Sequence, residues 1–154
     1  MSFSRIFQAT ALAVVLAVPL TGCFETISGP YDGPPLVEFD QVAGGYSADV
    51  PEGAGVISLR VNLIGPQQGS PITINVATTE GTTAVEGTHY AFPNGATVTI
   101  PANASSGQLQ IDILDDSLAA DESGVLNLEL TGSSDGTIEG ADNFDDFSIQ
   151  IVGQ

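Results

Sequence analysis

Carboxylates are the only chemistry-bearing side chains that this sequence contains in number. It has 19 aspartates and glutamates, but only 1 histidine, His89, and 1 cysteine, Cys23. A single histidine cannot supply the histidine pair of a zinc site or of a two-histidine facial triad, and the sequence has neither a G-x-S-x-G elbow nor a phosphate-binding loop. Carboxylate pairs can hydrolyse glycosides, but sugar sites need aromatic platforms, and the chain has only 3 tyrosines and a few phenylalanines. We therefore expect no enzymatic activity, and we expect His89 to help fix a turn.

The charge of the chain excludes nucleic acid as a partner. The chain has no lysine, and all 19 acidic residues follow residue 22, so a chain that begins at Cys23 carries a side-chain charge of −18 with Arg60 as its one basic residue. Such a surface repels phosphate backbones. Hydrophobic residues make up 42% of the chain, which predicts a folded domain rather than disorder.

So many acidic residues on a folded surface repel one another unless the charges are screened. At molar salt the Debye length is about 3 Å, which removes most of this repulsion. The composition therefore predicts a halophilic source. The alternative is that the carboxylates gather around divalent cations.

The N-terminal segment has the pattern of a secretory signal peptide. Arg5 provides a positive start, and an apolar run interrupted only by Gln8, Thr10 and Pro19 extends from Phe7 to Leu20. This run is shorter than the roughly 20 apolar residues of a membrane-spanning helix. We expect residues 1–22 to direct export and to be removed.

The residues Leu20-Thr21-Gly22-Cys23 end this segment. They resemble the lipobox of bacterial lipoproteins, in which a leucine and two small residues precede a lipid-modified cysteine. The resemblance implies that Cys23 carries a diacylglyceryl group and an acylated amine, and several acyl chains give stable membrane attachment. The alternative is an ordinary small residue at a plain cleavage site. Phe24 replaces the aspartate associated with inner-membrane retention in some bacteria, which favours the outer membrane.

The rest of the chain divides into a tether and one β domain. Residues 23–35 contain the cysteine and a Pro/Gly-rich flexible tether. Residues 36–154 are enough for a single domain with a proper core. In this domain apolar residues alternate with polar ones, as half-buried strands require, at residues 36–39, 46–50, 57–63, 72–76, 98–100, 109–113, 126–130 and 147–151. Gly, Pro, Asn and Asp lie between these segments. Seven to eight short strands of this kind predict an all-β, immunoglobulin-like antiparallel β-sandwich.

Four motifs in order resemble a Calx-beta domain, an immunoglobulin-like module of sodium–calcium exchangers and many bacterial surface proteins. They are Val50-Pro51-Glu52-Gly53-Ala54-Gly55, Glu86-Gly87-Thr88-His89-Tyr90, Val98-Thr99-Ile100-Pro101-Ala102-Asn103 and Ile111-Asp112-Ile113-Leu114-Asp115-Asp116. Together they span most of residues 36–154. Asn103 stands where the family usually has glycine, and asparagine tolerates left-handed backbone better than most residues.

In calcium-binding members of this family, carboxylates from loops at one end of the sandwich hold the metal. Ca²⁺ takes six to eight oxygen ligands, so several carboxylates must converge. The resemblance assigns this role to Glu52, Asp115 and Asp116, with Glu80 near a further family carboxylate. Other parts of the pattern are altered, because Ala119 and Ala120 fall near a usual acid, His89 replaces an aspartate, and the closing aspartates are absent. This implies a weak, degenerate calcium site, and the alternative is that Asp115 and Asp116 face water.

A second acidic segment lies near the C-terminus. Asp135, Glu139, Asp142, Asp145 and Asp146 lack the aspartate spacing and central glycine of an EF-hand loop. We expect a solvated loop there.

These observations lead to one main hypothesis and one alternative. The chain is expected to be a non-enzymatic protein that is exported and lipid-anchored in the cell envelope, where its domain serves adhesion, binding of a protein or glycan partner, or structural support. The alternative is a calcium-binding module at Glu52, Glu80, Asp115 and Asp116.

Overall fold

The computed structural model describes residues 31–40, 47–114 and 118–154, so the predicted signal peptide, Cys23 and residues 24–30 lie outside the described ranges. The described residues form ten strands: β1 (Leu36–Phe39), β2 (Ser47–Pro51), β3 (Gly55–Ile64), β4 (Ile72–Thr78), β5 (Tyr90–Ala91), β6 (Thr97–Ile100), β7 (Ser106–Ile113), β8 (Ser123–Ser133), β9 (Glu139–Gly140) and β10 (Asp146–Val152). These residues include no α-helix. No helix that could cross a bilayer is therefore found in this part of the chain.

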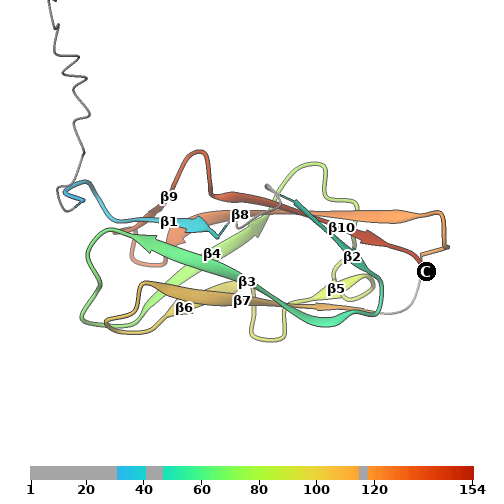
Figure 1. The fold of residues 1–154 in the computed structure, drawn as a ribbon, viewed down its shortest axis with the longest axis horizontal. Helices are drawn as coiled ribbons and strands as arrows, with labels where there is room; N and C mark the ends of the chain where they lie inside the picture. Colours follow the sequence, from blue (N-terminus) through green and yellow to red (C-terminus); the bar gives the residue numbers. More distant parts are fainter. Residues whose placement is uncertain (1–30, 41–46, 115–117) are drawn as a thin grey trace, which may run out of the picture.

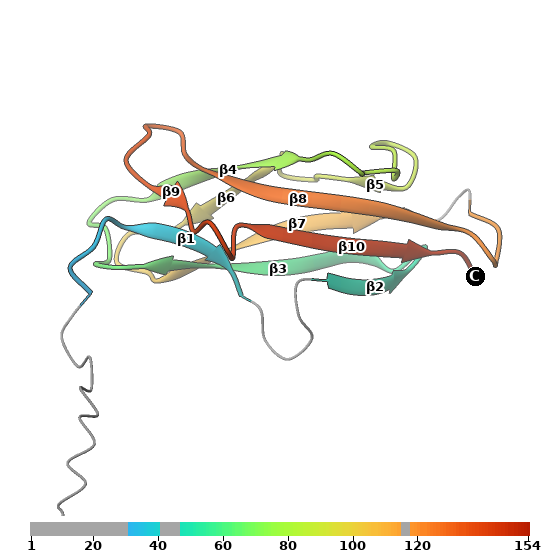
Figure 2. The same cartoon turned by 90° about the horizontal axis from the view of Figure 1, so that it is seen from above.

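The strands form two five-stranded sheets that pack face to face (Figures 1 and 2). One sheet has the order β5-β7-β3-β1-β9 and the other has the order β2-β10-β8-β4-β6. The predicted all-β sandwich is thus confirmed. The two additional strands, β5 and β9, have two residues each, which is too short to produce an alternating pattern.

Most neighbouring strands are antiparallel, as expected, but two pairs are parallel. The chain enters one sheet as β1 and the opposite sheet as β2, where it lies parallel to the last strand, β10, with Val50 opposite Ile151. Strand β1 also pairs in parallel with β9, with Leu36 opposite Glu139. The first two strands therefore pair with strands from the C-terminal part of the chain, β1 with β9 in one sheet and β2 with β10 in the other.

The core consists of the inward-facing residues of the two sheets. In β8 the side chains of Leu126, Leu128 and Leu130 are at most 1% exposed, while the residues between them are partly exposed. The facing sheet contributes Leu109 and Ile111 of β7, which are fully buried. This period of two is the one that the sequence predicts, because successive side chains of a strand point to opposite faces.

The predicted left-handed residue is also confirmed. Asn103 has a φ angle of 59° and is the only non-glycine residue with positive φ among the described residues. Its backbone N–H donates to the carbonyl oxygen of Gln68 over 2.8 Å. Asparagine thus takes the place that glycine has in the resembling family, at a backbone conformation it tolerates.

The turn after β8 depends on the hydroxyl and carboxylate groups of residues 133–137. The carboxylate Oδ1 of Asp135 accepts hydrogen bonds from the Ser133 hydroxyl over 2.6 Å and from the Thr137 hydroxyl over 2.7 Å. It also accepts the backbone N–H of Thr137 over 3.1 Å. These hydrogen bonds, first that from Ser133, lower the pKa of Asp135 from 3.8 to about 2. The ionised carboxylate is the form that fits this turn.

Asp135→Ala is expected to lower the melting temperature at neutral pH and to have little effect at very low pH. Because the folded-state pKa is depressed, the stabilisation by Asp135 is fully present above the unfolded value near 3.8 and is lost as the pH falls through about 2. Thermal unfolding of both proteins between pH 7 and pH 2 measures this. Exposed Asp121 provides the control substitution, Asp121→Ala. A melting difference for Asp135→Ala that is independent of pH would contradict the role of its charge.

Candidate functional site

Glu52 lies in the tight turn between β2 and β3, at one end of the sandwich. The turn uses two left-handed glycines, Gly53 with a φ of 73° and Gly55 with a φ of 72°. The backbone N–H of Glu52 donates to the carbonyl oxygen of Val152, and its carboxylate Oε2 accepts the backbone N–H of Leu118, each over 2.9 Å. This glutamate therefore links the β2–β3 turn to the C-terminal strand and to the segment before β8.

Glu122, a further acid at this end, stabilises the turn that contains it. The carboxylate Oε2 of Glu122 accepts the backbone N–H of Ala119 over 3.1 Å, and the N–H of Glu122 donates to the Ala119 carbonyl over 2.8 Å. Asp115 and Asp116 lie outside the described residues. Within the described ranges no three His, Cys, Asp or Glu side chains form a group that could hold a metal ion. The described residues alone therefore do not supply the ligand set that Ca²⁺ requires.

His89 lies near the same end and holds a turn, as predicted from the sequence. Its Nδ1 atom accepts the backbone N–H of Val85 over 2.7 Å. Its carbonyl oxygen accepts the N–H of Leu114 over 3.0 Å, immediately before the position of Asp115. The histidine thus has a structural use as a hydrogen-bond acceptor in this turn.

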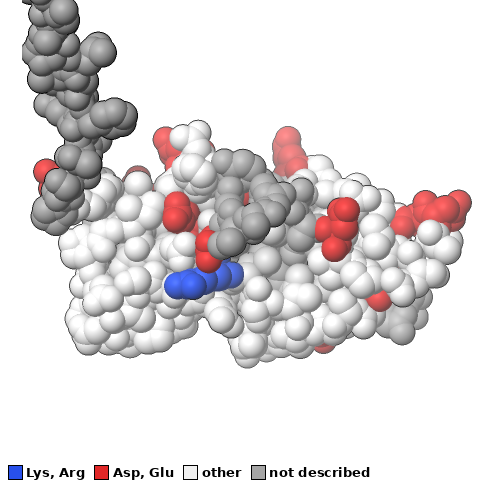
Figure 3. Space-filling model, viewed as in Figure 1, with Lys and Arg blue, Asp and Glu red and all other residues white. Residues whose placement is uncertain are grey.

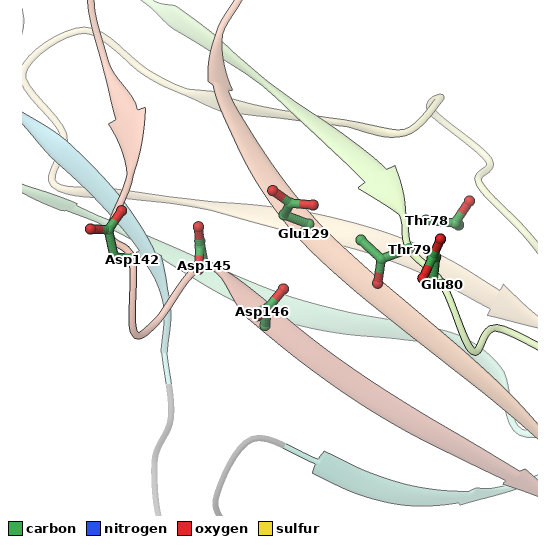
Figure 4. A pocket seen from close by; sticks show the side chains of 7 residues that line it. All are labelled: Thr78, Thr79, Glu80, Glu129, Asp142, Asp145 and Asp146. Atoms are coloured by element: carbon green, nitrogen blue, oxygen red, sulfur yellow. The ribbon is translucent and has the colours of Figure 1, made fainter.

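Glu80 belongs to a different surface. It lies in a hollow of about 760 Å³ that is lined by Thr78, Thr79, Glu80, Glu129, Asp142, Asp145 and Asp146 (Figure 4). Asp146 begins β10, whereas Val152, which contacts Glu52, ends it. Six residue steps along a strand cover about 20 Å. The structure therefore does not bring Glu80 together with Glu52, and it instead groups Glu80 with the acidic segment near the C-terminus.

The acidic hollow contains a close arrangement of like charges that the sequence analysis did not identify. Asp146 of β10 is directly opposite Glu129 of β8, and like charges in such a pair destabilise a sheet. The pKa of the nearby Asp145 carboxyl is raised, first by burial and then by the charges of Asp146 and Asp142. The alternation of apolar residues in β8 predicts that Glu129 points outward. The residue opposite Glu129 on β10 depends on the register of the two strands, which the sequence pattern does not give. Among the described residues, the carboxylates of the hollow do not converge into a metal-holding group.

Asp145→Asn is expected to raise the melting temperature at neutral pH and low salt. A raised folded-state pKa means that the ionised side chain is unfavourable in the folded protein, and this cost disappears as the pH falls below the unfolded value of 3.8. The advantage of the variant should therefore shrink toward pH 3, and it should shrink in molar NaCl because salt screens the repulsion. Thermal unfolding at two pH values and two salt concentrations tests this. Asp121→Asn, at the other end of the domain, is the matched control, and an equal gain there would contradict the local explanation.

The two sheets form a β-sandwich whose fold is like that of Calx-beta domains. The structure is similar to the apo-form Calx CBD1 domain, with a TM-score of 0.59 and 19% sequence identity over 79% of this chain and 99% of that domain. It is also similar to CBD12 from CALX1.2, with a TM-score of 0.57 and 19% identity over 77% of this chain and 44% of that one. At this level of identity the likeness concerns the fold. The Calx-beta-like fold implied by the four sequence motifs is thereby confirmed.

The same sandwich is found in a protein of another kind. A Bacteroides thetaiotamicron protein, EndoBT-3987, crystallised with a Man5GlcNAc product, matches with a TM-score of 0.51 and 11% identity over 70% of this chain and 28% of that one. No family model matches this chain. No curated protein matches it in sequence either.

Proposed function

We propose that this chain is a non-enzymatic lipoprotein of the cell envelope that presents a Calx-beta-like domain for adhesion, partner binding or structural support. The observation that carries the proposal is the order of its parts. A signal-like segment and the lipobox-like Leu20-Thr21-Gly22-Cys23 come first, a Pro/Gly-rich segment follows, and a fully packed sandwich begins at Leu36. In this proposal the lipid at Cys23 attaches the chain to the membrane, and the sandwich lies outside the bilayer, where a partner can reach it.

The use of the described polar residues supports a binding or structural role rather than catalysis. His89 accepts a hydrogen bond within a turn, Glu52 joins two loops, and Asp135 holds the turn after β8. Each of these side chains makes a hydrogen bond that stabilises a turn or joins two loops. A catalytic acid or base must instead reach a proton of the substrate.

A substitution at Cys23 tests the anchoring. The wild-type chain and Cys23→Ser are expressed in a bacterium that performs lipoprotein processing, with an alkyne-labelled fatty acid in the medium. The wild-type protein is expected to take up the label and to sediment with the outer membrane, whereas Cys23→Ser takes up none and is absent from the outer membrane. A serine variant that takes up the label, or that reaches the outer membrane in full amount, would contradict anchoring through Cys23. Wild-type protein found with the inner membrane would contradict only the outer-membrane assignment.

The alternative function is calcium binding at the end of the sandwich that holds Glu52. One observation favours it, because the turn of Glu52 packs against Leu114 and Leu118, on either side of Asp115 and Asp116. Gly53 donates to the Leu114 carbonyl over 3.1 Å, and Glu52 accepts from Leu118 over 2.9 Å. The described residues on either side of Asp115 and Asp116 therefore lie beside the turn of Glu52, while Glu80 lies in the hollow at Asp146.

Thermal unfolding separates the two functions. The full chain is heated at constant high NaCl with EDTA, with millimolar Ca²⁺ and with Mg²⁺ as a control. An ion at 100 times its dissociation constant adds about 2.7 kcal/mol to the free energy of unfolding. If calcium alone raises the melting temperature, and Glu52→Gln abolishes this rise while Glu86→Gln does not, the alternative is supported. Equal melting temperatures in all three solutions contradict it.

A further inference from the structure

A groove with an aromatic wall lies where the chain enters the sandwich, beside β1 and β9. It has a volume of about 460 Å³, and Figure 1 shows β1 and β9 side by side at this end of the domain. Its apolar lining comes from Tyr31, Leu36, Ile64 and Phe144. The two aromatic side chains are 43% and 41% exposed, respectively. Large hydrophobic side chains are otherwise exposed to this extent only at Val56 and Val85 among the described residues.

Local hydrogen bonds and close contacts hold the aromatic wall in place. The hydroxyl of Tyr31 donates to the carbonyl oxygen of Pro34 over 2.6 Å. Its ring lies against Gly65, where an added Cβ would come within 3.3 Å of a ring carbon and where φ is +115°. The backbone of Phe144 is fixed on both sides, because its carbonyl oxygen accepts the N–H of Phe39 over 2.9 Å and its N–H donates to Ala141 over 2.6 Å. A groove that is already ordered loses little entropy when it binds a ligand.

The rim of the groove is negatively charged. Glu38, Glu139 and Asp142 line it, and its lining includes no basic residue. Arg60 is the only lysine or arginine in the described part of the chain, and its Nε lies 3.8 Å from Asp40 (Figure 3). The groove therefore lacks a positive charge of its own to neutralise its three carboxylates.

Aromatic faces next to carboxylates favour a long cationic side chain. The ammonium or guanidinium group is attracted both by the ring faces and by the acidic rim, while its aliphatic stem can lie along Leu36 and Ile64. A neutral sugar can donate hydrogen bonds to these carboxylates, but it carries no charge for the three negative charges of the rim to attract. Charge complementarity therefore selects a basic ligand.

We propose that the groove between Tyr31 and Phe144 binds a lysine- or arginine-bearing segment of a partner protein. This inference rests on the proposed partner-binding function and names the chemistry of the partner. It also places the partner at the end of the domain where the chain comes from the proposed lipid anchor.

The test measures fluorescence anisotropy with a labelled peptide that alternates lysine and alanine. Full-length protein in a nonionic detergent is titrated into the peptide at moderate salt, and a peptide with glutamine in place of lysine is the control ligand. Phe144→Ala leaves the charge unchanged and is expected to weaken binding about fivefold. The double variant Glu139→Gln with Asp142→Asn is expected to weaken binding at least as much, because the two charges of the rim are lost.

A matched variant separates the groove from the general negative charge of the domain. Glu86→Gln with Asp121→Asn removes the same two charges from exposed residues that do not line the groove, and it should change the dissociation constant by less than about twofold, as expected for exposed charges outside the contact. The proposal is overturned if both double variants weaken binding equally, if Phe144→Ala binds like the wild type, if the glutamine peptide binds as tightly, or if the wild type does not bind the lysine peptide. Thermal unfolding of each variant confirms folding, and Tyr31→Ala replaces Phe144→Ala if the latter is unfolded. These results do not depend on lipidation of Cys23, so they are distinguishable from failure of the proposed anchoring.

Discussion

Leu126→Ala is expected to lower the free energy of unfolding by about 3 kcal/mol, within the range of roughly 2 to 5 kcal/mol for buried leucines. Leu126 of β8 is 0% exposed and lies opposite Ile149 of β10. On the other side of β8, the N–H groups of Thr83 and Ala84 donate to the Val125 carbonyl, so the backbone is held on both sides and cannot easily collapse into the cavity that alanine would leave. Urea denaturation of the two proteins at constant salt measures the difference.

An exposed position of similar chemistry provides the control. Val56 of β3 is 55% exposed, and Val56→Ala is expected to change the free energy of unfolding by no more than about 0.5 kcal/mol. Similar losses at the two positions would contradict the assignment of the β8 leucines to the core between the sheets.

Gly132→Ala is expected to cost about 3 kcal/mol, because two separate penalties meet at this residue. The φ angle of Gly132 is +92°, and an added Cβ would clash with the carbonyl oxygen of Ile138. The left-handed backbone accounts for roughly 1 to 2 kcal/mol, and the displacement of packed backbone adds about 1 to 3 kcal/mol. The residue lies at the register shift where Asn75 pairs with Gly132 but Val76 pairs with Leu130, so the loss would be local to this bulge.

Gly136→Ala measures one of the two penalties by itself. Gly136 has a φ of +71°, but a Cβ there would meet nothing within 4 Å. Its substitution should therefore cost roughly 1 to 2 kcal/mol, from the backbone alone. Equal effects at Gly132 and Gly136 in chemical denaturation would show that the contact with Ile138 contributes nothing.

The sheets could be predicted from the sequence because alternation is a local property. In β8 and β10 every second residue is apolar, and this period of two is retained in the burial of Leu126, Leu128 and Ile149. The parallel pairing of β2 with β10 could not be predicted in this way. It joins Ser47–Pro51 to a strand about 100 residues later, and no short-range pattern specifies such a partner.

The candidate sites show the same distinction. The turn around Glu52 could be predicted because Pro51 restricts its own φ angle and Gly53 and Gly55 permit the positive φ angles of the turn. The role of His89 in a turn followed from its neighbours. The position of Glu80 in the same hollow as Glu129 could not be predicted, since it depends on the register of β4 and β8. Asp142, Asp145 and Asp146 of the acidic segment near the C-terminus line the same hollow, and most acids of this segment are exposed to solvent, as expected.

The most direct test of the proposed function is the intact mass of the mature protein isolated from bacterial envelopes. We predict a chain that begins at Cys23 and carries a diacylglyceryl group on the thiol with an acyl group on the new amine. Mild base should remove the ester-linked chains and leave the thioether-linked glycerol. A mature chain with an unmodified Cys23, or one that begins after it, would contradict the claim that this Calx-beta-like domain is held at the envelope by lipid.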